Sequence, residues 1–200
     1  MYRWVGEVVL GNPSPQIVKE VGFLESPGGQ GEGDEVSQID RVLVTPGTQP
    51  LAWCALEVQA VYFSGAAMTK EWPGIAGHVG PGIPFPTGRR RPDYRSSGPK
   101  RLMPQLQIKV PSLRRWGKKM AVIVDESFWN ALGRMDEVPD VSNCDIAWFV
   151  VGYDEDVEHV RLIARTAHLT TLERSVEGLT AGVPVSLRAF EERIRAKLRT

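Results

Sequence analysis

Three polar residues on a predicted β-hairpin have the types and the spacing to bind a divalent metal ion. Asp40 lies in the first strand of this hairpin, and Glu57 and Gln59 lie in the second strand with one residue between them. If the turn centres near residues 47 and 48, Asp40 faces residues 55 and 56 and lies diagonal to Glu57. The hairpin therefore brings two carboxylates and one amide into the same neighbourhood.

Alternation along the second strand decides which side chains share a face. Glu57 and Gln59 point to one side, whereas Leu56 and Val58 point to the opposite side, which we expect to be covered by helices. Two buried carboxylates are costly unless a cation neutralises them, and oxygen ligands of this kind suit Mg²⁺, which retains several waters. The patch thus predicts a magnesium site able to activate a water against a phosphodiester.

The same three residues also have a simpler interpretation. Glu57 and Gln59 would lie on a solvent-facing strand edge, and Asp40 would pair with Arg41 or with a distant lysine. Spacing alone favours this simpler interpretation, because a match of three residues is weak evidence for a motif.

The hairpin that positions these residues has clear local signals. β-branched residues over 39–45 predict the first strand, the proline- and glycine-rich segment 46–50 predicts a turn, and the apolar run 51–63 predicts the second strand. Before the hairpin, Ser14-Pro15 followed by apolar residues at helical spacing predicts a helix over about 15–24. The glycine-rich segment 26–33 between them predicts a loop.

The rest of the chain alternates between predicted strands and helices. Residues 101–116 favour a kinked helix over a strand, because their leucines and valines recur at helical spacing around two prolines. The other elements expected are strands at 120–124, 146–153 and 159–169 and helices at 126–132 and 186–198. This order predicts an α/β fold, with a mixed central sheet flanked by helices.

Positive charge is concentrated in one part of a chain whose net charge is zero. Residues 89–119 contain 11 basic and 1 acidic residue, and their first part belongs to a Gly/Pro-rich excursion over about 72–100. Arginine forks in such a loop can meet phosphates or guanine edges, so we predict these DNA-binding residues: Arg89, Arg90, Arg91, Arg95, Lys100 and Arg101. The alternative is a solvated surface that compensates the acidic segment 120–160.

Two stretches of sequence resemble a known enzyme family. Asp40 followed across a hairpin by Glu57-x-Gln59 resembles the PD-(D/E)xK nuclease signature in its variant with glutamine in place of lysine. The segments WCALEVQAVYFSG, at 53–65, and RRPDYRSSGPKRLMPQLQIKVPSLRRWGKKMAVIVD, at 90–125, resemble the NotI-type restriction endonuclease family. The similarity extends over most of the chain, and it implies a restriction-endonuclease-like core.

The resemblance also implies a role for each residue of the hairpin. Asp40 and Glu57 would ligate a catalytic Mg²⁺, with Mn²⁺ able to substitute, and the backbone carbonyl of Val58 would be a further ligand. Gln59 would stand in the lysine position, where a neutral amide can orient a water but cannot act as a cation. Related nucleases add a glutamate from the first helix, for which Glu20 and Glu35 are candidates here.

The activity that follows from the resemblance is cleavage of double-stranded DNA by a Mg²⁺-dependent endonuclease of the type II restriction class. A homodimer is implied, because two equivalent sites related by two-fold symmetry match a palindromic target. The alternative is a DNA-binding or assembly subunit that keeps the nuclease fold within a multi-protein defence or repair system. Ile39 stands at the first signature position in place of proline, which leaves the metal site intact.

Length and composition limit the other possibilities. Two hundred residues with 42% hydrophobic content predict a single globular domain spanning residues 1–200, without a membrane-spanning run or a secretion signal, and we expect a cytoplasmic protein. The two cysteines predict buried thiols rather than a disulfide scaffold. His78, His159 and His168 lack ligand-like spacing, so no zinc site is expected from them.

Overall fold

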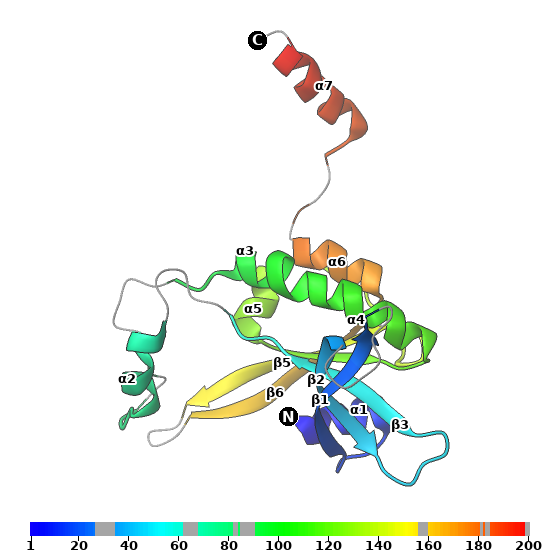
Figure 1. Ribbon diagram of the computed structural model, residues 1–200. Helices are drawn as coiled ribbons and strands as arrows, with labels where there is room; N and C mark the ends of the chain where they lie inside the picture. Colours follow the sequence, from blue (N-terminus) through cyan, green and yellow to red (C-terminus); the bar gives the residue numbers. More distant parts are fainter. Residues whose placement is uncertain are drawn as a thin grey trace.

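The fold is built on one six-stranded mixed sheet whose strands follow the order of the chain, β1 to β6 (Figure 1). The computed structural model describes residues 1–26, 35–61, 68–81, 84, 91–155, 160–180, 182 and 185–198. The strands are β1 (Gln16–Glu25), β2 (Glu35–Thr45), β3 (Ala52–Val58), β4 (Met120–Asp125), β5 (Ile146–Glu155) and β6 (Val160–Thr170). β3, β4 and β5 run parallel, and the remaining neighbours are antiparallel.

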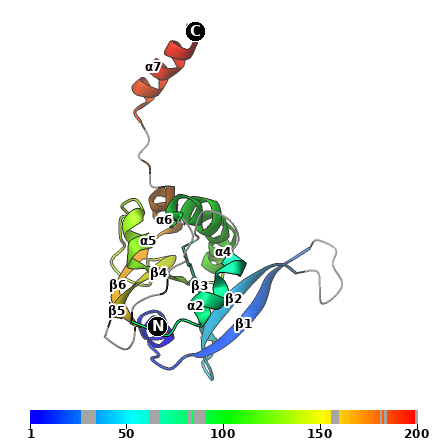
Figure 2. The same ribbon diagram turned by 90° about the vertical axis from the view of Figure 1, so that its left-hand side faces the viewer.

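Helices cover both faces of this sheet. The helices are α1 (Tyr2–Leu10), α2 (Trp72–Ala76), α3 (Tyr94–Ser97), α4 (Met103–Arg115), α5 (Glu126–Ala131), α6 (Leu172–Thr180) and α7 (Leu187–Leu198), with a 3₁₀ turn at Met68–Lys70 and a π turn at Gly98–Leu102. In Figures 1 and 2, α4 and α6 lie together on one face and α1 lies on the other. The predicted α/β architecture with a mixed, helix-flanked sheet is confirmed.

Each face of the sheet has its own apolar core. On the α4 side, Leu106, Val110 and Leu113 pack with alternate residues of the central strands, including Val122 and Trp148. On the α1 side, a second group packs around Val5, and its members are Leu43, Cys54, Leu56, Ala121, Ile123, Ala147, Phe149 and Val151. The central strands are buried on both faces, which explains their continuous apolar sequences.

The predicted helix at 15–24 is wrong, because this segment is strand β1. Its apolar residues Ile17, Val18 and Val21 are β-branched, a type that fits a pleated strand better than a helix. β1 pairs with β2 from Gln16, opposite Val44, as far as Glu25, so tertiary pairing decides the structure of this segment. The helix that does precede the sheet is α1, which the sequence reading missed.

The other predicted elements agree with the structure in their type. Strands are present at 39–45, 120–124 and 146–153, and the half-exposed strand expected at 159–169 is β6. The helix at 101–116 is α4 with its preceding π turn, and helices α5 and α7 lie at the two remaining predicted positions. Helix α6 was not predicted, and β3 ends at Val58, earlier than expected.

The turn between β2 and β3 occurs where the sequence predicted it. Gly47 has a φ of 78°, a left-handed conformation that glycine adopts at low cost. The Thr48 hydroxyl donates to the Thr45 carbonyl and accepts from the Ala52 amide, so one side chain ties the two strand ends together. These bonds fix the strand pairing on which the predicted metal site depends.

The Gly/Pro-rich excursion over 72–100 is only partly an excursion. Its beginning forms the short helix α2, while residues 82–83 and 85–90 and the predicted loop at 27–33 lie outside the described residues. Its end returns to the body of the protein, since Ser97 and Gly98 are buried and Tyr94 stacks on Phe128 with ring centroids 6.3 Å apart. Over the part of the chain that the structure describes, no helix is long and apolar enough to cross a membrane.

The two cysteines are predicted to resist modification in the folded protein. Cys54 and Cys144 are both buried, as the sequence indicated, and burial raises the pKa of the Cys54 thiol to about 12 and the pKa of Cys144 above its usual value. Only the thiolate reacts, so both residues should react slowly with a disulfide reagent at mildly alkaline pH. Protein unfolded in guanidinium chloride should release both thiols at once, and fast reaction of either cysteine in the native state would contradict this prediction.

Candidate active site

The structure brings Asp40 and Glu57 to neighbouring positions on adjacent strands. Arg41 pairs with Leu56 in the last pair of the β2–β3 ladder, and Asp40 and Glu57 are the next residues along the two strands. The Asp40 charge raises the pKa of Glu57, so the two carboxylates are close enough to interact. The β2–β3 register is shifted by one residue from the predicted pairing of Asp40 with residue 56.

Glu57 faces helix α4. Ala55 pairs with Val42 and packs in the core beneath α4, and alternation puts Glu57, two residues after Ala55, on the same side. Ile39 packs in this core as well, and Asp40 next to it is exposed. We expected this side of β3 to be the one without helices, and that expectation is wrong. Helices cover both faces, and Glu57 lies under α4 with a 5% exposed fraction.

The partner of Glu57 is a lysine on α4. The Lys109 Nζ donates to Glu57 Oε2 at 2.9 Å and to Gln105 Oε1 at 3.0 Å. Both side chains of the ion pair are buried, with 5% and 6% of their surface exposed. Burial raises the pKa of Glu57, and the Asp40 charge adds to this effect, while the hydrogen bond and charge of Lys109 act in the opposite direction.

Asp40 has a different environment from Glu57. Its side chain is exposed, so one carboxylate of the pair faces solvent and the other lies in the protein interior. A ligand entering from solvent would meet Asp40 and then reach Glu57. This gradient of exposure suits a hydrated cation that retains some of its waters when it binds.

Gln59 and Val58 end the strand at the site. Gln59 is 7% exposed, its backbone amide donates to the Ile123 carbonyl at 2.9 Å, and its side-chain amide donates to the Ala60 carbonyl. Val58 pairs with Ile123 in the parallel ladder and is exposed. These contacts hold the end of β3 against β4, so that the backbone near Glu57 is fixed.

The two candidate third carboxylates differ in their positions. Glu20 lies on β1 between the pairs Lys19–Arg41 and Val21–Ile39, which is the position opposite Asp40, and it has a φ of 55°. Glu35 lies five residues before Asp40 on β2, or about 16 Å away along an extended strand. That distance excludes Glu35 from the site, and among the described residues no three acidic, histidine or cysteine side chains come together to hold a metal.

The donor set fits a small divalent cation with several water ligands. It consists of the carboxylates of Asp40 and Glu57, with the neutral Gln59 immediately after the end of β3. Mg²⁺ binds through one or two carboxylates and keeps the rest of its shell as water and substrate oxygens. The residues present therefore fit the ion, with Asp40 and Glu57 as the side chains that would hold it.

The basic segment divides into two parts with different roles. Its second part is used inside the protein: Arg114 bonds Asp145 and Glu173, and Lys118 and Lys119 donate to backbone carbonyls. The predicted DNA-binding residues lie in the first part. Arg91, Lys100 and Arg101 are exposed, Arg95 is on α3 with its side chain outside the described part, and Arg89 and Arg90 are outside the described residues.

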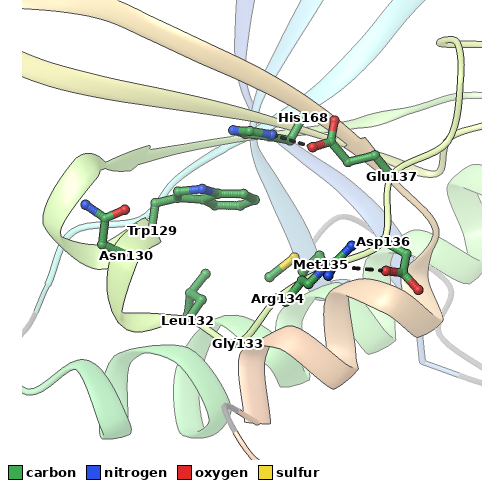
Figure 3. Close-up of a pocket in the computed structure, with 9 residues that line it drawn as sticks. All are labelled: Trp129, Asn130, Leu132, Gly133, Arg134, Met135, Asp136, Glu137 and His168. Atoms are coloured by element: carbon green, nitrogen blue, oxygen red, sulfur yellow. Dashed lines mark hydrogen bonds and ion pairs between the residues drawn. The ribbon is translucent and has the colours of Figure 1, made fainter.

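A cavity of about 660 Å³ lies elsewhere, between α5, residues 132–137 and β6 (Figure 3). Trp129 and His168, which both line it, stack directly on each other with ring centroids 4.5 Å apart, and His168 Nδ1 lies 2.8 Å from Glu137 Oε1. None of the predicted catalytic residues lines this cavity. His168 thus contacts the Trp129 ring, Glu137 and Thr166, and these contacts give no indication that it binds a metal.

Sequence reading missed one residue of the site, Lys109. Its signal was present, because Lys109 follows Leu106 by three positions on the helix whose apolar face was recognised. Residues three apart share a helix face, so a lysine there is directed to the core rather than to solvent. We counted it instead as one of the surface cations of the basic segment.

A mixed sheet with helices on both faces, with Asp40 and Glu57 at neighbouring positions on two of its strands, is compatible with a metal-dependent nuclease. The model of the family described as Restriction endonuclease NotI matches residues 1–164. The chain therefore belongs to the NotI restriction endonuclease family, and it is by that membership a DNA-cleaving endonuclease with a restriction-endonuclease-like fold. A comparison with curated proteins found no match.

Proposed function

We propose that this chain is a Mg²⁺-dependent type II restriction endonuclease that cuts double-stranded DNA as a cytoplasmic homodimer. The observation that carries the proposal is the neighbouring position of Asp40 and Glu57 on adjacent strands, with Glu57 bound to a lysine of helix α4, in a member of the NotI family. Dimerisation is proposed because one site cuts one strand, and two-fold symmetry would supply the second site.

The chain's own residues have distinct tasks in this reaction. Asp40 and Glu57 hold the ion, with the Val58 carbonyl as a proposed third protein ligand, and Gln59 orients the attacking water through its amide. When bound, Mg²⁺ supplies Lewis-acid stabilisation of the phosphate and lowers the pKa of a water. Water then adds to phosphorus in line with the leaving oxygen, and the products carry a 5′-phosphate and a 3′-hydroxyl.

The test is incubation of purified protein with supercoiled plasmid and Mg²⁺, with a chelator in the control reaction. We expect discrete fragments, because a restriction enzyme cuts at defined sequences. Random degradation would contradict restriction-type specificity, and absence of cutting across Mg²⁺ and Mn²⁺ concentrations would contradict the proposed activity. Sedimentation of the protein on a cognate oligonucleotide measures whether two chains are present.

Gln59 variants should change the metal preference of the enzyme. Gln59→Glu adds a third negative charge and a further oxygen ligand next to Asp40 and Glu57, so cleavage should shift in favour of Mn²⁺ over Mg²⁺. Gln59→Ala should retain more activity than Asp40→Ala, since orienting a water contributes less than holding the metal. The measurement is the ratio of cleavage rates in the two metals.

Gln107→Glu is the matched control for Gln59→Glu. It places the same new charge on the exposed surface of α4, outside the site, and the Mn²⁺/Mg²⁺ rate ratio should stay at the wild-type value. An unchanged ratio in Gln59→Glu, or a Gln59→Ala variant as inactive as Asp40→Ala through loss of metal, would show that the role assigned to Gln59 is wrong.

Neutralising Lys100 and Arg101 should weaken DNA binding and flatten its salt dependence. Both residues are exposed on the π turn before α4, and each lost phosphate contact should reduce the slope of log affinity against log salt by about 0.9. The Arg89/Arg90 double variant tests the preceding segment of the sequence in the same way. Arg134→Ala, which removes an exposed arginine beside the distant cavity, is the control. An unchanged slope in both double variants would place the DNA elsewhere.

A further inference from the structure

Lys109 is a buried cation in a place where the core would accept an apolar residue. Its side chain is 5% exposed, and its helical neighbours Leu106, Val110 and Leu113 all lie in the core beneath α4. Replacing a buried ion pair with apolar residues often leaves stability unchanged or raises it, so the pair is weak evidence for a role in stability alone. A role in the chemistry of the site explains it better.

The position of Lys109 complements the composition of strand β3. Gln59 follows the end of β3 at Val58, its side-chain amide donates to the Ala60 carbonyl, and it is neutral in a site whose other predicted groups are carboxylates. The Lys109 ammonium reaches Glu57 Oε2 from helix α4, 52 residues further along the chain. The side-chain oxygen Oε1 of Gln105 accepts a hydrogen bond from a second of the three N–H groups of Lys109, and this bond fixes the direction of the ammonium.

We propose that Lys109 is the catalytic cation of this site, supplied by helix α4 in place of the lysine that Gln59 replaces on strand β3. This inference rests on the proposed nuclease function. The ammonium stabilises the negative charge that develops on the phosphate oxygens when water attacks, and its bond to Glu57 keeps it next to the reacting group before DNA arrives.

The charge that develops during phosphodiester hydrolysis determines what the Lys109 ammonium does in the proposed mechanism. The water oxygen forms a bond to phosphorus and releases its proton to solvent, the bond between phosphorus and O3′ breaks with its electron pair on O3′, and O3′ takes a proton from solvent. Negative charge on the non-bridging oxygens is greatest between these two events. Removal of one preorganised charge donor of this kind costs about 10²- to 10³-fold in kcat.

The test moves the cation from the helix to the strand. Lys109→Met removes the charge while keeping the length of the side chain, and Gln59→Lys in the Lys109→Met background returns a cation two residues after Glu57 in the sequence. Arg115→Met removes a charge from the exposed surface of the same helix as a control. The measurements are kcat and KM for plasmid cleavage, Mn²⁺ affinity by calorimetry and thermal unfolding.

We expect Lys109→Met to cut about 10²-fold more slowly with an unchanged KM, and to bind Mn²⁺ at least as tightly as wild type, because the metal no longer competes with the ammonium for Glu57. Gln59→Lys/Lys109→Met should regain at least about tenfold in kcat. If Lys109→Met alone fails to fold, the double variant decides, since it keeps the charge balance of the site.

Four results would overturn the inference. Cleavage by Lys109→Met at the wild-type rate would show that the cation has no catalytic role. A folded double variant without recovered kcat, or a loss of kcat that follows weaker Mn²⁺ binding and a lower unfolding temperature, would reduce Lys109 to a structural partner of Glu57. A wild-type protein that cleaves DNA with neither Mg²⁺ nor Mn²⁺ would overturn the nuclease proposal and this inference together. The other results leave the nuclease proposal intact.

Discussion

Asp40→Ala should abolish DNA cleavage and leave both the fold and DNA binding intact. Asp40 is exposed, so its removal leaves no buried charge without a partner, whereas Glu57→Ala would leave Lys109 unpaired in the interior. Loss of a metal ligand should reduce the cleavage rate by at least about 10³-fold, or about 4 kcal/mol in the activation barrier. Plasmid cleavage under single-turnover conditions measures the effect.

The controls for Asp40→Ala separate catalysis from folding and binding. Asp136→Ala removes an exposed carboxylate outside the site and should cut at the wild-type rate. Phosphate contacts remain in Asp40→Ala, so its affinity for DNA should stay close to that of wild type. Glu57→Gln keeps a hydrogen-bond acceptor for Lys109 and should be folded but inactive. Full cutting by Asp40→Ala or by Glu57→Gln would remove the pair from the active site.

Trp148→Ala should destabilise the protein by about 3–5 kcal/mol, a large part of the stability of an ordinary domain. Trp148 is fully buried on β5, and its indole N–H donates to the hydroxyls of Thr170 and Ser175, 3.0 and 3.1 Å away. Its removal leaves a cavity between the sheet and α6 and takes away the donor shared by both hydroxyls. Urea unfolding followed by circular dichroism measures the loss.

Trp72→Ala is the matched control for this core substitution. Trp72 begins α2 and is 62% exposed, so its removal should change the free energy of unfolding by no more than about 0.5 kcal/mol. Trp148→Phe should fall between the two, since it keeps most of the volume and loses the hydrogen bonds. Equal stabilities of Trp148→Ala and Trp72→Ala would show that β5 is not packed as described.

The parts of the fold that sequence could predict are those with strong local signals. The turn at 46–50, the apolar strands and α4 were all recognised, because each pattern has one dominant interpretation. β1 was mistaken for a helix because apolar residues at 17, 18, 21 and 24 satisfy a helical period, while the partner that decides for a strand, β2, is distant in the sequence. Tertiary pairing overrides a local period of this strength.

The candidate site was predicted on its hairpin side and missed on its helix side. Asp40 and Glu57 are close in the chain, so hairpin geometry alone could place them within one residue of their observed register. Lys109 comes from a separate element, and only the packing of α4 on the sheet brings it to Glu57. Lys109 was counted among the cations of the basic segment, although its spacing from Leu106 puts it on the buried face of the helix, whereas Lys100 is exposed.

The separation between the hairpin and α4 also determines when the site becomes complete. A ribosome adds residues at about 5–20 per second, so the hairpin leaves it several seconds before Lys109 does. During that interval Asp40 and Glu57 lack the cation that balances Glu57 in the folded protein. A nascent chain therefore contains both acids before Lys109 is synthesised, and under the role proposed for Lys109 it becomes a competent nuclease only after that residue has been added.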